Sequence, residues 1–213
     1  MSYLFENTIN MIKKIGLAAA IIGIILYSLN ATKPDASAYS AKLNKSRSEK
    51  NRSFRQSDSS PLSAEQKAQF DSLKYYPAQL AFVIPATISL NTNPDTTLIQ
   101  MSDNRAEKYL NWGIAKFQID NKPQQLGIYL KATGKDSTLF IPFTDPTNGH
   151  ETYGGGRYLD AAKPKLDATE IELDFNQAYN PYCAYNNEYS CPVPPAANRL
   201  QVAIPAGEKS FHE

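Results

Sequence analysis

The chain has 213 residues, and 22 Lys and Arg against 21 Asp and Glu give it a formal net charge of +1 at pH 7. This balance lacks the basic excess that holds proteins on nucleic acid and the acidic excess typical of disordered chains, so neither class is expected. A closed four-ligand zinc site built from Cys and His would need both Cys and both His of the chain. No metal site and no cofactor are predicted.

An uncharged apolar run occupies Ile15–Leu29, directly after Lys13 and Lys14. Its length of about 15 residues is short for a spanning helix of ~20 residues but suits the core of a signal peptide. Residues 1–30 are therefore predicted to be a signal anchor or a signal peptide, with a buried helix as the alternative. The paired lysines would keep the N-terminus cytoplasmic and place the domain on the extracytoplasmic side. It would be anchored in the membrane, or secreted if cleaved near Ala38.

Residues 31–56 are polar, and apolar side chains between Tyr39 and Gln56 are sparse, standing at Leu43 and Phe54. This composition predicts a polar linker and an exposed helix, which lies against the domain or forms a stalk. Contact of its basic residues with anionic lipid is the alternative.

The β-rich domain is predicted over residues 57–213 and begins with a short helix. Ser63 and Gln66 form a capping-box pattern there, and Tyr75–Pro77 is expected to end the helix.

From Leu80 onward the residues become β-rich, with turn residues between short segments. No alternation of strands and helices is present, so the fold class is mainly β, an antiparallel β-sandwich or partly open β-barrel. One or two N-terminal helices precede it, after the apolar N-terminal helix. Pro85 indicates an edge or a bulge. The predicted strands are Leu80–Leu90, Thr97–Met101, Tyr109–Asp120, Gln125–Ala132, Thr138–Phe143, Tyr158–Leu159, Glu170–Phe175 and Leu200–Ile204.

Two segments, Phe143–Asp160 and Asp174–Lys209, differ from ordinary β connections. The first contains Gly154–Gly156, whose backbone can take positive φ and approach other groups closely. The residues after these glycines favour a strand over a helix, which excludes a phosphate-cradling loop. The glycines are expected to form a bent hairpin or the floor of a pocket into which Arg157 points.

The second segment is stiffened by prolines and contains Cys183 and Cys191. In an exported domain this spacing predicts a disulfide that closes a small loop. The alternative is a reduced pair that ligates a metal or reacts as a thiol, with His150 as its base.

Charged and amide side chains concentrate in both segments. Carboxylates beside an Arg commonly form structural ion pairs, but such a set can also line a pocket for a small polar or anionic ligand. The candidate ligand-binding residues are Asp145, Glu151, Tyr153, Arg157, Asp174, Asn176, Tyr179, Asn180, Asn198 and Arg199.

The same segments resemble a large family of uncharacterised bacterial and archaeal proteins that share a domain of unknown function. The resemblance rests on ETYGGGRYL within Phe143–Leu159, LDFNxAYNPYCAYN at Leu173–Asn186 and CPxPPxxNRL at Cys191–Leu200. Shorter matches occur at Ser60–Leu62, Phe70–Pro77 and Ala206–Lys209, so the resemblance covers residues 39–209. It implies no activity.

Together these features predict an exported, membrane-tethered β-domain held through Ile15–Leu29. It would bind a small polar or anionic ligand, or a cell-envelope component, through the Gly154–Arg157 and Asn176–Asn198 loops. The alternative is a hydrolase-like enzyme with Asp145, Glu151 or Asp174 as acid or base. A weaker alternative is a thiol or metal site at Cys183, Cys191 and His150.

Overall fold

The computed structural model of the protein describes residues 35–132, 138–165 and 167–212. The predicted apolar helix at Ile15–Leu29 lies outside these residues. The β-rich part belongs to one compact unit, Ser40–Glu213. Within the described residues, no helix is long and apolar enough to cross a membrane.

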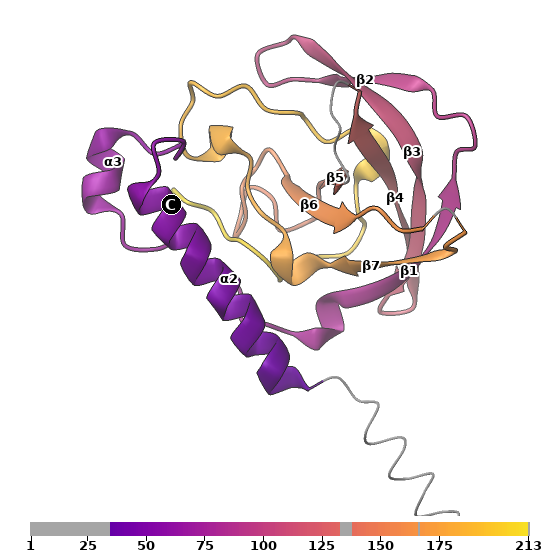
Figure 1. Ribbon diagram of the computed structural model, residues 1–213, viewed down its shortest axis with the longest axis horizontal. Helices are drawn as coiled ribbons and strands as arrows, with labels where there is room; N and C mark the ends of the chain where they lie inside the picture. The colour runs from indigo at the N-terminus through magenta and orange to yellow at the C-terminus, as the bar shows by residue number, and fades with distance from the viewer. Residues whose placement is uncertain (1–34, 133–137, 166, 213) are drawn as a thin grey trace, which may run out of the picture. The chain divides into compact units, whose positions relative to one another are not determined.

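Seven antiparallel strands form one sheet that curls into a nearly closed barrel (Figure 1). The order across the sheet is β6-β5-β4-β3-β1-β7, and β2 pairs with β3. The prediction of a mainly antiparallel, partly open barrel is confirmed. The strands are β1 (Val83–Leu90), β2 (Thr96–Gln100), β3 (Ala106–Ile119), β4 (Lys122–Lys131), β5 (Thr138–Phe143), β6 (Arg157–Ala162) and β7 (Glu170–Asp174).

Along much of β1, β3 and β4 alternate residues are buried, and those of the main core cluster fill the barrel interior. In β1, for example, Ile84, Ala86 and Ile88 are buried, whereas Pro85 and Thr87 face solvent. This alternation follows from the period of two in a β-strand. The aromatic part of the core packs Phe143 edge-on against Phe175, with ring centroids 5.4 Å apart.

The β3–β4 hairpin turns at Asp120 and Asn121, which have φ of 49° and 61°. Two successive positive φ angles are typical of the type I′ turn that suits a twisted hairpin, and Asp and Asn tolerate this conformation. The turn lies where the predicted strands Tyr109–Asp120 and Gln125–Ala132 follow each other in the chain.

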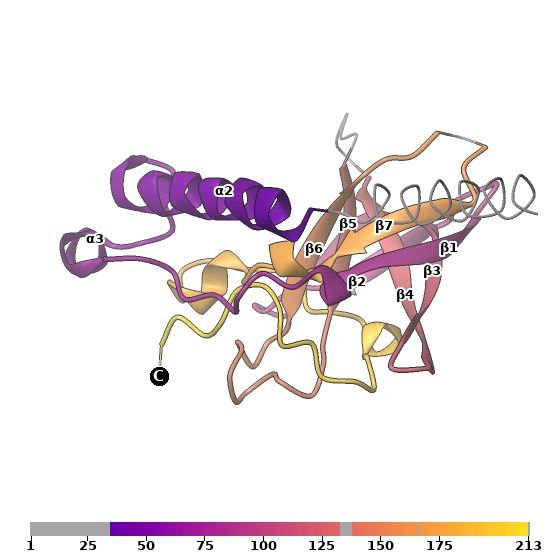
Figure 2. The ribbon, with the colours of Figure 1, turned by 90° about the horizontal axis from the view of Figure 1, so that it is seen from below.

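In the described part of the chain, two helices precede the barrel and lie next to each other (Figure 2). Helix α2 spans Ala36–Gln56 and α3 spans Ala64–Gln69. The capping box of Ser63 and Gln66 is confirmed. The helix ends at Gln69 rather than near Tyr75, because Phe70 adopts an extended backbone. Its ring is buried in a second cluster with Phe54, Leu62, Leu73 and Tyr185.

The prediction of a strand at Leu200–Ile204 is wrong, although its apolar residues are buried alternately as expected. Side chains take the place of a neighbouring strand here. Gln124 Oε1 accepts from the backbone N–H of Gln201 at 3.0 Å. Asp145 Oδ2 accepts from the N–H of Ile204 at 3.2 Å. The segment is therefore buried and irregular, with its backbone satisfied by polar side chains.

Short 3-10 turns complete the chain: η1 (Leu80–Phe82), η2 (Phe175–Gln177), η3 (Tyr182–Ala184) and η4 (Ala196–Asn198). The first of these occupies the start of the predicted strand Leu80–Leu90.

Candidate functional site

Arg157, predicted to point into a pocket, is fully buried and forms an ion pair with Asp145. Its Nη2 lies 3.0 Å from Asp145 Oδ2, and both side chains have no exposed surface. Burial lowers the pKa of Arg157, and the charge of Asp145 opposes this shift. Asp145 Oδ1 also accepts from the N–H of Thr147 at 3.0 Å. Both charges thus lie inside the protein, with protein groups as their partners.

The guanidinium of Arg157 also holds the chain end. Nη2 donates to Ile204 O at 2.9 Å, and Nη1 donates to Ala206 O and, at 3.3 Å, to Glu208 O. The face of the Phe143 ring lies 5.3 Å from the guanidinium carbon. Arg157 therefore fixes the backbone of residues 204–208.

A second buried charge, Glu208, is only 1% exposed. Lys50 of α2 lies 2.7 Å from its Oε2. Its Oε1 accepts from Asn180 Nδ2 at 3.1 Å and from the hydroxyl of Tyr185. This network joins α2, the loop after β7 and the C-terminal segment.

Two predicted site residues, Asn176 and Asn198, use their side-chain amides to hydrogen-bond backbone N–H and C=O groups, as a neighbouring strand would. Asn198 Oδ1 accepts from Gly127 N at 2.7 Å, and its Nδ2 donates to Gly127 O at 2.9 Å and Pro142 O at 2.7 Å. It thereby bridges β4 and β5. Asn176 makes the same two-way pairing with Gln79, at 2.9 Å to its N and 2.8 Å to its O. Both side chains are buried.

The remaining predicted residues lie apart from one another. Asp174 caps η2 and accepts from Gln177 Nε2 at 2.7 Å, whereas Tyr179 donates to Asp160 at 3.1 Å. Partial burial raises the pKa of Asp160, and the hydrogen bond from Tyr179 opposes this shift. Arg199 and Glu151 are exposed. The ten predicted residues therefore do not converge on one pocket.

A surface hollow of about 300 Å³ lies beside the glycine segment. Its ionisable side chains come from three parts of the chain: Lys74 before η1, His150 and Glu151 before β6, and Lys209 with His212 near the C-terminus. We call it the cationic hollow, because its two lysines outnumber its one carboxylate. Gly149, Thr152, Gly154 and Ser210 complete its lining.

Backbone hydrogen bonds hold these three segments together. Lys209 N donates to Lys74 O at 2.9 Å, and Ser210 N donates to Glu151 O at 3.0 Å. The ammonium of Lys209 lies 4.5 Å from the centroid of the Tyr76 ring, a cation–π distance. The position of Lys209 thus depends on the segment that Arg157 fixes.

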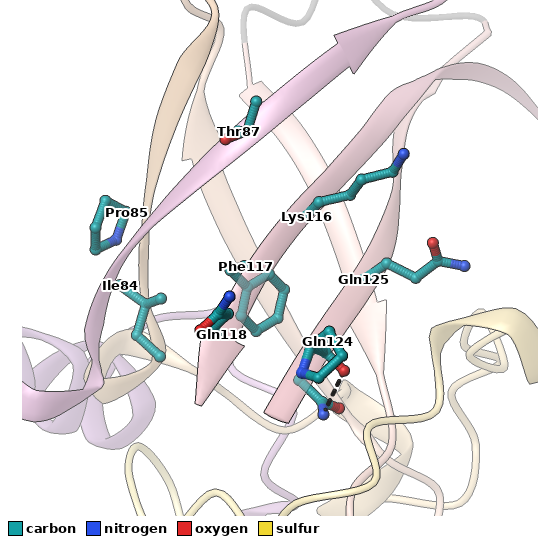
Figure 3. A pocket seen from close by; sticks show the side chains of 9 residues that line it. Ile84, Pro85, Thr87, Lys116, Phe117, Gln118, Gln124 and Gln125 are labelled. Carbon is teal, nitrogen blue, oxygen red and sulfur yellow. Dashed lines mark hydrogen bonds between the residues drawn. The ribbon is translucent and has the colours of Figure 1, made fainter. Parts of the chain in front are cut away.

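A larger groove of about 630 Å³ lies between β1 and β3 (Figure 3). The paired register of these strands ends at Thr87 and Lys116, whereas the pairing of β1 with β7 continues over Val83–Thr87. Buried Phe117 and Ile84 lie among the amides of Gln118, Gln124 and Gln125. Lys116 is the charged residue of its lining.

The two cysteines are free thiols in the structure and not the predicted disulfide. They are nevertheless in contact, since the N–H of Cys183 donates to Cys191 Sγ at 3.2 Å. Tyr153 is the neighbouring side chain, with its hydroxyl 3.7 Å from Cys183 Sγ, whereas His150 lines the cationic hollow. Over the described residues, no group of three His, Cys, Asp or Glu side chains is placed to hold a metal ion.

Several residues of these networks escaped the sequence predictions. Lys74, Lys209 and His212 belong to the cationic hollow, and Lys50 and Glu208 form the second buried ion pair. The sequence signal for Glu208 is its place in the AGEK motif. In the structure, the glycine before it, Gly207, adopts a φ of 78°. For the groove, Pro85 within a strand and the Gln124–Gln125 pair were the available signals.

Comparison with known proteins places these observations in a family. The family model described as "Protein of unknown function (DUF1684)" matches residues 68–209. An uncharacterised protein from Haloarcula marismortui, whose structure was solved by NMR in solution, is 36% identical. That match covers 83% of this chain and 97% of the other, with a TM-score of 0.66. No curated protein matches the chain.

Proposed function

Since this chain belongs to the DUF1684 family, whose model is described as a protein of unknown function, we propose a function from the geometry of its own surface. The protein is an extracytoplasmic β-domain, tethered to the membrane, that binds a small anionic ligand in the cationic hollow.

The charge of the hollow is the observation that carries this proposal. Lys74 and Lys209 bring two ammonium groups, and His150 and His212 bring imidazole N–H donors, against the carboxylate of Glu151. Charge-assisted hydrogen bonds to such groups are shorter and stronger than neutral ones. A volume of about 300 Å³ suits a small ligand such as a phosphate ester or a small carboxylic acid.

The buried ion pair supports the same site indirectly. Arg157 holds residues 204–208, and the hydrogen bonds of Lys209 and Ser210 continue from that segment into the hollow. Arg157 is thus a positioning residue. Contrary to the prediction from the sequence, its side chain does not touch the ligand, because the guanidinium has no exposed surface.

Binding is tested by thermal unfolding and isothermal titration of the full chain with inorganic phosphate, pyrophosphate and citrate. A ligand at concentrations on the order of 100 Kd is expected to stabilise the folded state by about 2.7 kcal/mol. The double variant Lys74→Gln/Lys209→Gln is expected to lose most of that effect, and added salt to weaken it.

Lys116→Gln is the matched control, because Lys116 is an exposed lysine in the β1–β3 groove and outside the hollow. It should bind like the wild type. Equal loss in the control and the double variant would mean that only overall charge matters, and the hollow would no longer be the site.

The tether is supported by the uncharged run Ile15–Leu29 after two lysines. Anchoring is favoured over cleavage near Ala38 by the start of α2. There Asp35 Oδ1 accepts from the N–H groups of Ser37 at 2.8 Å and Ala38 at 3.2 Å, so these residues form a capped helical turn. A phosphatase that is active only outside the cytoplasm, fused after residue 213, should be active and remain in the membrane fraction. An inactive fusion, or a soluble active one, contradicts the tether.

A hydrolase has less support from the geometry. Asp145 is paired with Arg157, and Asp174 caps η2. Glu151 is the carboxylate that lines the cationic hollow. Turnover of a phosphate or carboxylate ester that is lost in Glu151→Gln, while binding persists, would favour the enzyme.

A further inference from the structure

Cys183 and Cys191 form a thiol pair with unequal access to solvent. Cys191 is 7% exposed, whereas Cys183 is only half buried at the second position of η3. A dissolved reagent therefore reaches Cys183 first.

The surroundings of the pair hold both residues in place. The backbone N–H of Cys183 donates to Cys191 Sγ at 3.2 Å. Cys191 is fixed on its other side, where its N–H donates to Ser102 Oγ at 3.0 Å and its carbonyl accepts from Ser102 N at 2.9 Å. The turn between β2 and β3 thus anchors one cysteine directly beside the other.

The donors around Cys183 favour its thiolate. The thiol of Cys191 donates to it, and the hydroxyl groups of Tyr153 and Ser102 also hydrogen-bond to it, which together lower the pKa of Cys183 to about 6. The same contact raises the pKa of Cys191. Thiolates are the attacking form in thiol–disulfide exchange, so the two cysteines have different chemical roles.

We propose that Cys183 and Cys191 are a reversible dithiol–disulfide centre, in which Cys183 attacks and Cys191 resolves. The co-reactant is a small or protein disulfide, RSSR. The Cys183 thiolate attacks one sulfur of RSSR, forms a mixed disulfide and expels one RS⁻. Cys191 then passes its proton to solvent and attacks Cys183 Sγ, which forms the Cys183–Cys191 bond and expels the second RS⁻. In total the protein loses two electrons and two protons, and RSSR becomes two RSH.

The centre is tested on the reduced full chain with glutathione disulfide, followed by acid quenching and peptide mass spectrometry. The wild type is expected to yield the intramolecular disulfide with only transient glutathione on Cys183. Cys191→Ser is expected to stop at glutathione on Cys183, because the resolving thiol is absent. Cys183→Ser is expected to react at least tenfold more slowly than the wild type, because its remaining thiol is buried.

Tyr153→Phe tests the donor contact and should slow attack by Cys183, since one hydrogen bond to the thiolate is lost. Tyr189→Phe, which lies between the two cysteines in the sequence, is the matched control and should react like the wild type. Two results overturn the proposal: stable glutathione on Cys183 in the wild type, or first attack by Cys191. The peptide map of the wild type reports both, whether or not a variant folds.

Discussion

At the scale of single residues, the buried polar side chains of this protein are structural. Three charges lie inside the domain, on Arg157, Asp145 and Glu208. Removal of the partner would leave each of these charges unpaired. A buried ion pair contributes little net stability compared with apolar residues of the same size, but breaking one side of it is costly. This difference gives a direct test.

Arg157→Met is expected to lower the free energy of unfolding by about 3–5 kcal/mol, because the carboxylate of Asp145 remains buried without its cation. Urea unfolding followed by circular dichroism measures the loss. The double variant Arg157→Met/Asp145→Leu should recover part of it, since neither charge is then present. The control is Arg105, which forms an exposed ion pair with Asp103. Arg105→Ala should change the free energy of unfolding by less than about 1 kcal/mol. A similar effect of both single variants contradicts the structural role of Arg157.

The thiol of Cys183 makes stability depend on pH. Its pKa falls from an ordinary 9.0 to about 6 in the folded state, so between these values the unfolded chain binds more protons than the folded one. The stabilising contribution is complete above about pH 9 and is lost as the pH falls through 6. With reductant present, the stability of wild type relative to Cys183→Ser should therefore rise between pH 6 and 8.5. Denaturant unfolding at several pH values measures this difference, and a constant difference contradicts the shift.

At the scale of elements, amide side chains complete a sheet that the backbone leaves open. Strands β4 and β5 share one registered pair, Tyr129 with Phe140. The side chain of Asn198 supplies three hydrogen bonds to backbone groups of the same two strands. A long buried segment without regular structure needs such partners, because its peptide groups have no water to bind.

Asn198→Ala is expected to cost about 3 kcal/mol or more, because it leaves backbone groups of Gly127 and Pro142 without their partner, each at roughly 1–3 kcal/mol. Thermal and chemical unfolding measure the effect. Asn187→Ala, at an exposed position of the same long segment, is the control and should lie within about 0.5 kcal/mol of the wild type. Equal stability of the two variants contradicts the bridging role.

At the scale of the whole molecule, α2 belongs structurally with the β-rich part. From Ser40 onward it lies in the same compact unit as the barrel. Phe54 is buried in the cluster with Phe70 and Tyr185, and Lys50 neutralises Glu208. The composition of this helix predicted an exposed face, which is correct for most of its residues, while a few buried contacts attach it.

A chain that begins at residue 57 is therefore expected to be less stable than one that begins at residue 35. It loses the buried Phe54 ring, whose removal typically costs about 3–5 kcal/mol, and leaves the carboxylate of Glu208 without Lys50. Unfolding in urea compares the two chains. Lys50→Met within the longer chain separates the charge from the packing. The same midpoint for both lengths would show that α2 does not contribute to the stability of the barrel.

The sequence by itself determined what depends on neighbours along the chain. The change to β-rich residues after Leu80 and the Ser63 capping box are local patterns, and each predicted its element. The segments Phe143–Asp160 and Asp174–Lys209 were also recognised as unusual, since their glycines, prolines and amides do not fit ordinary β connections. The motifs they contain led to the family.

Only the tertiary structure decided what those polar residues do. Leu200–Ile204 has the alternation of a strand, but its partners are the side chains of Gln124, Asp145 and Arg157, which lie far away in sequence. The cationic hollow likewise joins Lys74, Glu151 and Lys209 from three separate segments. Such convergence depends on long-range packing, which leaves no periodic signal in a single sequence.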